Sequence, residues 1–327
     1  MPSGMAMLWL GLALSLGYGA ARLSGPLLRS RGRLAAWGSW LAATALLFLP
    51  LLIPASAVVW RAVAAVACTE WMFKMLDYRR STLADRGDGS PADGPRYSRF
   101  LVPFFPPFHV SWNLFGRRPP AGFSRIKSFR QIAVGTMMAV AGFVVLALRS
   151  RFTFPAEHFA VDHAIVFAAF IPTMEGISLA LLGLEHLAGF GTSPLVRGIL
   201  RSRTPAEFWL RYNTRVHRWL RENLFVPAGG VRSPGRGIVL TFLSSAALHE
   251  GMFAIATSVL DGRQFAFFAL QAPAVLLSPA LERFAKDGGL ARKIVSHGVT
   301  ILWFYATSML FFRGVQRVFP FLYVHPL

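Results

Sequence analysis

Long apolar stretches constrain this chain more than any other feature of its sequence. Eight of them lie at roughly 5–22, 34–53, 55–76, 129–149, 158–182, 237–260, 264–282 and 294–312. Each has about 20 residues, the length that crosses the hydrocarbon core of a bilayer. Hydrophobic residues make up 54% of the 327 residues and charged residues only 15%. The sequence therefore predicts an all-α polytopic membrane protein, in which about eight transmembrane helices form a single domain, 1–327, around a buried cavity.

The basic residues are distributed unevenly between the loops. Of the 34 Lys and Arg residues, 27 lie in loops on one predicted side and only five in loops on the other. Because cytoplasmic loops carry an excess of Lys and Arg, we expect loops 77–128 and 183–236 to be cytoplasmic and both termini to lie outside. The aromatic and proline-rich part of 77–128 is expected to lie on the membrane surface. The net charge of +19 is then mainly a signal of membrane topology. A second role of the basic loops would be to bind anionic lipid or an anionic cosubstrate. It does not indicate nucleic-acid binding.

The sequence offers little for a metal site. Cys68 is the only cysteine, which excludes a disulfide framework and a cysteine-based metal site. His158, Asp162 and His163 lie together near the outer end of the fifth span. They lack a further partner at a suitable spacing, so we expect no metal.

Residues 204–225 predict an amphipathic helix at the membrane surface. Thr204 suits the N-cap, Pro205 suits the first helical position, and Glu207 completes a capping box. On a continuous helix with 100° per residue, Asn213 and His217 fall in the apolar half although ample polar surface is present. An inward-facing amide and imidazole indicate either a cavity or a tie to a neighbouring segment.

The span 237–260 carries two ionisable residues, His249 and Glu250, in otherwise apolar surroundings. If the helix begins near Arg236, His249 lies about 20 Å deep, past the bilayer midplane. Ionisable groups at that depth normally face a bundle interior or a water-filled cavity. A structural histidine bonded to a neighbouring helix is the alternative.

The segments FWLRYNTRVHRWLRENLFVP and TFLSSAALHEGMF together resemble the signature of the membrane-bound O-acyltransferases. The resemblance is closest to the wax synthase-like and the sterol or diacylglycerol acyltransferase-like branches, and it covers about 205–253. The matching residues are Phe208, Trp209, Tyr212, Asn213, Val216, His217, Trp219, His249 and Glu250. Tyr212 stands where these families usually have Trp. The resemblance implies that Asn213 and His249 are the catalytic pair.

The resemblance also implies a fatty acyl-CoA cosubstrate, no permanently bound cofactor, and a lipid acceptor such as a long-chain alcohol, a diacylglycerol or a sterol-like lipid. The expected acyl-CoA contacts are Trp209, Arg215, His217, Arg218 and Trp219. For His217 a packing role is the stronger expectation, and the arginines could bind lipid headgroups or only fix topology.

Two other functions stay open at this point. One is O-acylation of a sugar or another polar metabolite, and the other is a transporter that uses intramembrane His and Glu. Internal repeats, which transporters often show, are not seen. Glu175, Glu185 and His186 could pair with arginines of the cytoplasmic loops or line the cavity. Glu70 and Lys74, four residues apart in the third span, are expected to pair with each other. The acceptor, the acyl chain length, the membrane and the question of a homo-oligomer are left open by the sequence.

Overall fold

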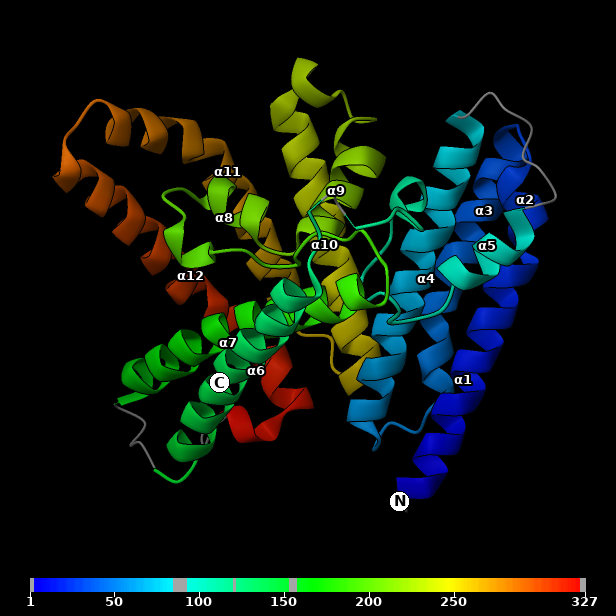
Figure 1. Cartoon of the computed structure of the whole chain (residues 1–327), viewed down its shortest axis with the longest axis horizontal. Coiled ribbons are helices and arrows are strands. Elements are labelled where there is room, and N and C mark those ends of the chain that lie inside the picture. The colour runs from blue at the N-terminus through cyan, green and yellow to red at the C-terminus, as the bar shows by residue number, and fades with distance from the viewer. Residues whose placement is uncertain (1–2, 85–92, 120–121, 153–157, 324–327) are drawn as a thin grey trace. The chain divides into compact units, whose positions relative to one another are not determined.

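A computed structural model describes residues 3–84, 93–119, 122–152 and 158–323 (Figure 1). The described residues form helices and loops, with no strand among them. Seven helices are long and apolar enough to cross a membrane: Gly4–Leu23, Arg33–Leu52, Arg125–Arg149, Phe159–Leu187, Pro234–Thr257, Arg263–Lys286 and Leu290–Val318. The prediction of an all-α polytopic membrane protein is confirmed. The side on which the termini lie stays a prediction, and residues 1–2 and 324–327 fall outside the described part.

The eighth expected span, 55–76, is the exception. It forms helix α4 (Val58–Ala84), which has sufficient length but is not among the seven apolar helices. Its charged residues, which include Glu70, Lys74 and Asp77, lower its hydropathy. Nearly all its residues from Ala64 to Arg79 are nevertheless buried. Seven of the eight predicted spans thus meet both criteria, and the crossing of the membrane by α4 stays a prediction.

Contacts within the chain group into two compact units. The first contains Met1–Gly116 and His249–Leu260, and the second contains Arg117–Leu248 and Asp261–Leu327. Helix α10 (Pro234–Thr257) runs through the boundary without a break. That the whole chain is one domain stays a prediction, and each unit is described by itself.

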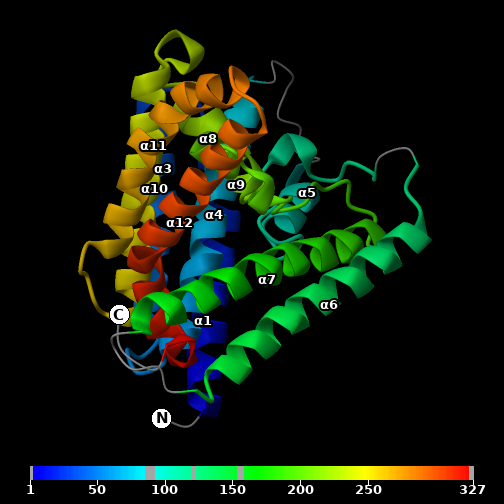
Figure 2. The same cartoon turned by 90° about the vertical axis from the view of Figure 1, so that its left-hand side faces the viewer.

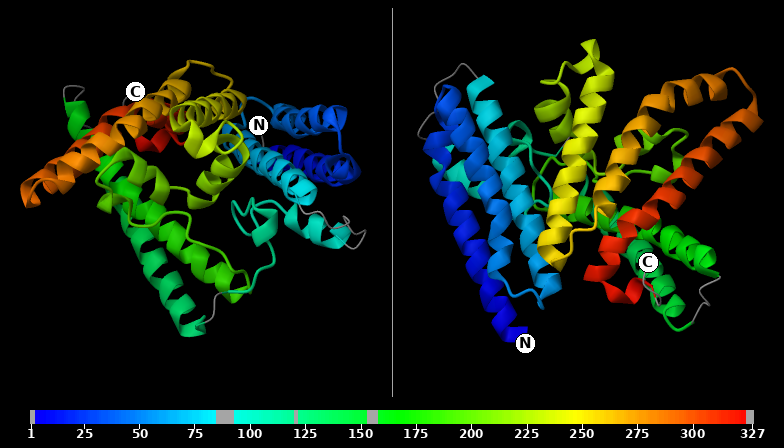
Figure 3. Two further views of the ribbon diagram at one scale, coloured as in Figure 1. Left: turned by 90° about the horizontal axis from the view of Figure 1, so that it is seen from above. Right: turned by 180° about the vertical axis from the view of Figure 1, so that it is seen from behind.

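The first unit is built around α4. Helices α1 (Ser3–Leu23), α2 (Gly25–Arg29) and α3 (Arg33–Ala45), with the 3-10 helix η1 (Leu46–Leu52), pack against it; Figure 3 shows α1, α3 and α4 side by side in blue and cyan. The contact is close, because a Cβ atom on Gly17 would lie only 2.1 Å from the ring of Trp71. Helix α5 (Asp93–Phe100) and the 3-10 helix η2 (Trp112–Leu114) complete the unit.

Segment 101–115 is fastened to buried polar groups of α4. Glu70 accepts a hydrogen bond from the backbone N–H of Phe104 at 3.0 Å, and Asp77 accepts one from Trp112 at 2.7 Å. The Nζ atom of Lys74 lies 2.7 Å from Glu70, which confirms the expected i,i+4 pair. These contacts compensate the buried charges of α4 within the unit.

The second unit begins with two tightly packed helices, α6 (Arg125–Arg149) and α7 (Phe159–Leu187), which run side by side in Figure 2. Glycines allow this approach: a Cβ atom on Gly135 would lie 2.5 Å from the backbone of Gly176 and Ala180. Small residues of this kind let helix backbones pack closely in membranes.

The remaining helices of this unit carry the sequence-predicted site residues except His249, which belongs to the first unit. They are η4 (Ile199–Arg201), α8 (Pro205–Arg211), α9 (Thr214–Leu220), the π-helical turn η5 (Arg221–Phe225), η6 (Gly230–Arg232), the first part of α10, α11 (Arg263–Lys286), α12 (Leu290–Val318) and η7 (Pro320–Leu322). Helices α11 and α12 pack together, and α8 packs against α11.

The residues near the start of α7 that could have suggested a metal have other partners. Arg149 and Asp162 form a buried ion pair through two hydrogen bonds. The Nδ1 atom of His163 lies 2.8 Å from the Tyr323 hydroxyl, and its Nε2 atom lies 3.1 Å from Oγ of Ser308. These contacts tie α7 to α12 and to the chain after it.

Candidate active site

Helix α8 begins as the sequence predicts. The Thr204 hydroxyl accepts a hydrogen bond from the backbone N–H of Glu207 at 3.2 Å, and Pro205 occupies the first turn. The Glu207 carboxylate accepts from the backbone N–H of Arg203 and pairs with Arg211. Burial alone would raise the pKa of Glu207, but these two partners hold it below its ordinary value. The start of the helix is thus fixed by its own side chains.

The expected continuous helix over 205–224 is wrong, because the chain breaks at Asn213. Helix α8 ends at Arg211 and α9 starts at Thr214. Asn213 between them has φ 46° and ψ 57°, in the left-handed region that Asn tolerates better than most residues. It caps α9 by accepting a hydrogen bond from Val216 N–H at 3.4 Å. The break, and not a position on a helix wheel, sets the direction of this side chain.

The cap bond also orients the amide of Asn213. Since Oδ1 faces the backbone N–H of Val216, the NH2 group faces away from α9. Within the described part of the chain this NH2 group donates to no other residue. Asn213 is therefore held in place while its donor remains available to a ligand.

A neighbouring segment braces the break from both sides. The backbone N–H of Thr214 donates to the carbonyl of Leu195 at 2.9 Å, and its hydroxyl donates to that of Pro194 at 2.6 Å. On the other side of Asn213, the carbonyl of Arg211 accepts from the N–H of Arg197 at 3.1 Å. Backbone bonds on both sides restrict the motion of Asn213.

Helix α7 anchors the bracing segment through polar side chains in the span. The Glu175 carboxylate accepts from the backbone N–H of Ile199 at 2.7 Å, and Oγ of Ser178 accepts from Val196 N–H at 2.8 Å. Sequence reasoning left the role of Glu175 open and missed Ser178. A carboxylate inside an apolar helix was the available signal, but its partner is a backbone group that no side-chain pattern reveals.

The strongest anchor is a buried ion pair between α7 and α9. The Arg215 guanidinium donates to both oxygens of Glu185, at 2.8 and 2.5 Å, and also to the carbonyl of Ser193. Thr192 donates to the same carboxylate, and His186 contacts the carbonyl of Thr192 at 3.1 Å. Both charged side chains are buried. This ion pair holds α9 against α7, and the expected contact of Arg215 with acyl-CoA phosphates stays a prediction.

The other expected acyl-CoA contacts on α9 differ in their surroundings. Arg218 is exposed, and Trp219 is buried. His217 is half-buried, and burial together with the positive charge of Arg221 lowers its pKa. It is therefore largely neutral near pH 7. Arg218 is the residue of this group with a cation turned to solvent.

Trp209 on α8 lies in a ring of aromatic side chains. Its indole contacts Phe242 of α10, Phe268 of α11 and Phe304 of α12. It also packs against the cluster that contains buried Ala246, three residues before His249. Its Nε1–H is buried and has no hydrogen-bond partner among the described residues. Buried donors in proteins are normally hydrogen-bonded. The indole N–H of Trp209 is therefore suited to donate to an acceptor group of a bound ligand.

His249 lies fifteen residues after Pro234, the first residue of α10. At 1.5 Å per residue this is about 22 Å from the start of the helix. The imidazole is half-buried, and Glu250 is buried. Because His249 belongs to the first unit and Asn213 to the second, their action as a pair stays a prediction.

Comparison with known proteins identifies the family. The model of the membrane-bound O-acyltransferase family matches residues 130–311, more than half of the chain and the part that contains Asn213 and His249. The chain therefore belongs to the membrane-bound O-acyltransferase family.

Several plant proteins are similar over a shorter stretch. Diacylglycerol O-acyltransferase 1-1 of Oryza sativa subsp. japonica is 27% identical over 124 residues, which are 37% of this chain and 22% of the relative. Diacylglycerol O-acyltransferase 1-2 of the same plant is 29% identical over 102 residues, 30% of this chain and 21% of the relative. Diacylglycerol O-acyltransferase 1C of Glycine max is 26% identical over 122 residues, 37% and 22% of the two chains. The matches thus span about a fifth of the length of these relatives.

Proposed function

We propose that this protein transfers a fatty acyl group from acyl-CoA to the hydroxyl of a membrane-soluble lipid. The observation that carries the proposal is the fixed break at Asn213, which leaves the amide NH2 group without a partner in the described part of the chain. Membership in the family and the names of the plant relatives support the same reaction class.

In the proposed reaction His249 is the general base. It takes the proton of the acceptor hydroxyl while the oxygen attacks the thioester carbonyl carbon, since an alcohol is a weak nucleophile without a base. The amide of Asn213 donates a hydrogen bond to the oxyanion that forms. Collapse of this intermediate breaks the C–S bond, and the thiolate of CoA receives the proton from His249. The products are an ester and free CoA, without an acyl-enzyme.

Trp209, His217, Arg218 and Trp219 are the proposed contacts of the acyl-CoA. The unpartnered indole N–H of Trp209 supports its place beside a polar group of this cosubstrate. The exposed Arg218 suits a phosphate. His217, neutral near pH 7, would line the acyl-CoA site without adding charge. Membrane lipids surround the spans, and the predicted cytoplasmic loops face the pool in which acyl-CoA is made.

For the acceptor we favour diacylglycerol. The relatives are named as diacylglycerol O-acyltransferases, which supports this choice over the long-chain alcohol of a wax synthase-like enzyme. Sterol-like lipids and polar acceptors such as sugars are the competing outcomes. Purified protein supplied with labelled acyl-CoA and one acceptor at a time separates them by the labelled ester that forms.

The decisive variants are His249→Ala and Asn213→Asp. We expect His249→Ala to lower turnover about 10²–10⁴-fold. Asp keeps the cap oxygen and tolerates the left-handed backbone but lacks the NH2 donor, so Asn213→Asp should lower turnover about 10²–10³-fold with thermal stability preserved. The double variant should lose little more than either single one, because residues that act as a unit are non-additive. Fully multiplicative losses, or normal turnover in His249→Ala, would contradict the shared site.

A further inference from the structure

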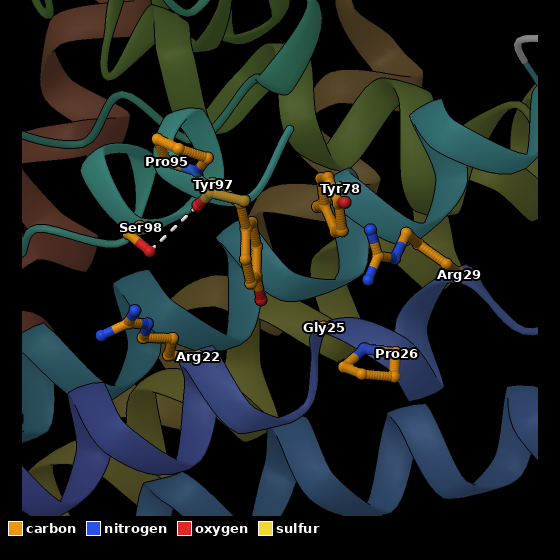
Figure 4. Close-up of a pocket in the computed structure, with 9 residues that line it drawn as sticks. Arg22, Gly25, Pro26, Arg29, Tyr78, Pro95, Tyr97 and Ser98 are labelled. Atoms are coloured by element: carbon orange, nitrogen blue, oxygen red, sulfur yellow. Dashed lines mark hydrogen bonds between the residues drawn. The ribbon is translucent and has the colours of Figure 1, made fainter. Parts of the chain in front are cut away.

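The first unit contains a cavity that the proposed reaction does not use. It has a volume of about 470 Å³, within the range of ligand pockets, and lies where the end of α1 meets α2, α4 and α5 (Figure 4). Its lining includes Arg22, Arg29, Tyr78, Tyr97 and Ser98. The lining is thus basic and aromatic.

The aromatic wall of this cavity is firmly built. The rings of Tyr78 and Tyr97 are stacked with centroids 4.2 Å apart, and both side chains are buried. The Tyr97 hydroxyl donates to the carbonyl of Ala21 at 3.0 Å, and the Tyr18 hydroxyl donates to that of Ser98 at 3.1 Å. These two bonds hold α5 against the last turns of α1, so the cavity is part of the fold.

Three arginines near the cavity have partners within the first unit. Arg79 donates to the carbonyl of Ser30 at 2.8 Å, Arg80 pairs with Asp77, and Arg96 lies over the ring of Trp112. Arg22 and Arg29, by contrast, make no hydrogen bond or ion pair within the described part of the chain. In the view of Figure 4 their guanidinium groups lie on either side of the Tyr97 ring. Among the described residues, the exposed Arg22 and the half-buried Arg29 thus bring positive charge to the cavity without a carboxylate partner.

The position of the cavity along the spans indicates its depth. One candidate span ends at Leu23 and the next starts at Arg33, so the cavity lies at the connection between two membrane-crossing helices. We therefore expect that connection to lie at the level of the lipid headgroups. The distribution of Lys and Arg predicts that this side is cytoplasmic, where anionic lipids are enriched.

We propose that this cavity binds the phosphate of an anionic glycerophospholipid, held by Arg22 and Arg29 beside the tyrosine wall. Two guanidinium groups suit a phosphate because each can donate two parallel hydrogen bonds. The headgroup depth favours a lipid over a free anion, although inorganic phosphate offers the same chemistry. The site uses none of the residues assigned to acyl transfer, and its occupancy is measurable without any turnover.

The test uses the full chain in detergent and a fluorescent short-chain phosphatidic acid as the probe. The double variant Arg22→Gln, Arg29→Gln should bind it at least about tenfold more weakly, because it loses charge-assisted hydrogen bonds. The matched control is Arg31→Gln, Arg33→Gln, which removes the same charge from exposed residues that follow α2 and do not line the cavity. It should change affinity about twofold or less at physiological salt, since exposed charges outside the cavity are screened.

Two results would overturn the proposal. Equal losses in the two double variants would show general attraction to positive charge, with no role for the cavity. Competition by inorganic phosphate at concentrations equal to the probe would show a free-anion site instead of a lipid site. A phosphatidylcholine probe should bind equally to the parent and to both double variants, because its headgroup has no net charge.

Discussion

Both units fasten a loop segment to a long helix through carboxylates, but they neutralise those carboxylates in different ways. In the first unit Glu70 and Asp77 of α4 hold segment 101–115. Their cations, Lys74 and Arg80, lie three or four residues further along the same helix. Helix α4 therefore carries its own compensating charges, wherever the loop lies.

The second unit distributes the charges over distant parts of the chain. Glu175 of α7 receives only a backbone N–H from the bracing segment. Glu185 receives its cation from Arg215, thirty residues later in the sequence. The helix thus depends on the loop for neutralisation, and the loop that carries Asn213 depends on the helix for its position. The comparison indicates that the buried ion pair of the candidate site joins distant parts of the chain, whereas the ion pairs of α4 are local.

The largest effect should follow from Arg215→Ala. It leaves the buried Glu185 carboxylate without its cation, which typically destabilises a protein by about 3–5 kcal/mol. Turnover should fall as well, because α9 and its cap residue lose their anchor. The measurement is thermal unfolding and acyl transfer of the purified variant.

The matched control for this variant is Arg218→Ala, which removes the same charge from an exposed position one turn away. Its stability should stay within about 0.5 kcal/mol of the parent, while its KM for acyl-CoA rises. Equal destabilisation by the two variants would remove the distinction between the anchoring and the exposed arginine.

An intermediate effect is expected for Glu175→Ala. The backbone N–H of Ile199 loses its acceptor, and an unsatisfied buried donor costs about 1–3 kcal/mol. Glu282→Ala on α11 is the control, because Glu282 is exposed. Hydrogen exchange of the 193–199 segment should quicken only in Glu175→Ala. Unaltered exchange would show that the bracing segment does not need this anchor.

The smallest effect is expected in the first unit, for the double variant Glu70→Gln, Lys74→Met. A buried ion pair replaced by groups of similar shape is often close to neutral, and Gln still accepts from Phe104 N–H. We expect a stability change within about 1.5 kcal/mol, measured by thermal unfolding. A loss as large as that of Arg215→Ala would mean that α4 is no more self-sufficient than α7.

Local features of the sequence predicted local structure well. The cap at Thr204 and the pair of Glu70 with Lys74 were predicted because their partners lie three or four residues apart. Seven of the spans were predicted because a bilayer requires one length and one composition.

What the sequence did not predict depends on distant contacts. The break at Asn213 follows from backbone bonds to Leu195 and Arg197, in a stretch that local periodicity describes as a continuous helix. The partner of Glu185 could not be chosen among the many arginines of the loops. The surroundings of α4 were not predictable from composition either, because its charges lower its hydropathy and only the packing shows that neighbouring helices shield Lys74.

The self-neutralised charge of α4 has a consequence for how the protein is made. A helix with buried Arg61, Glu70, Lys74 and Asp77 is a poor substrate for insertion into a bilayer by itself. Its covering helices α1 and α3 precede it in the chain and are synthesised first. We therefore expect α4 to insert against α1 and α3 instead of bare lipid, so that the three helices enter the membrane together.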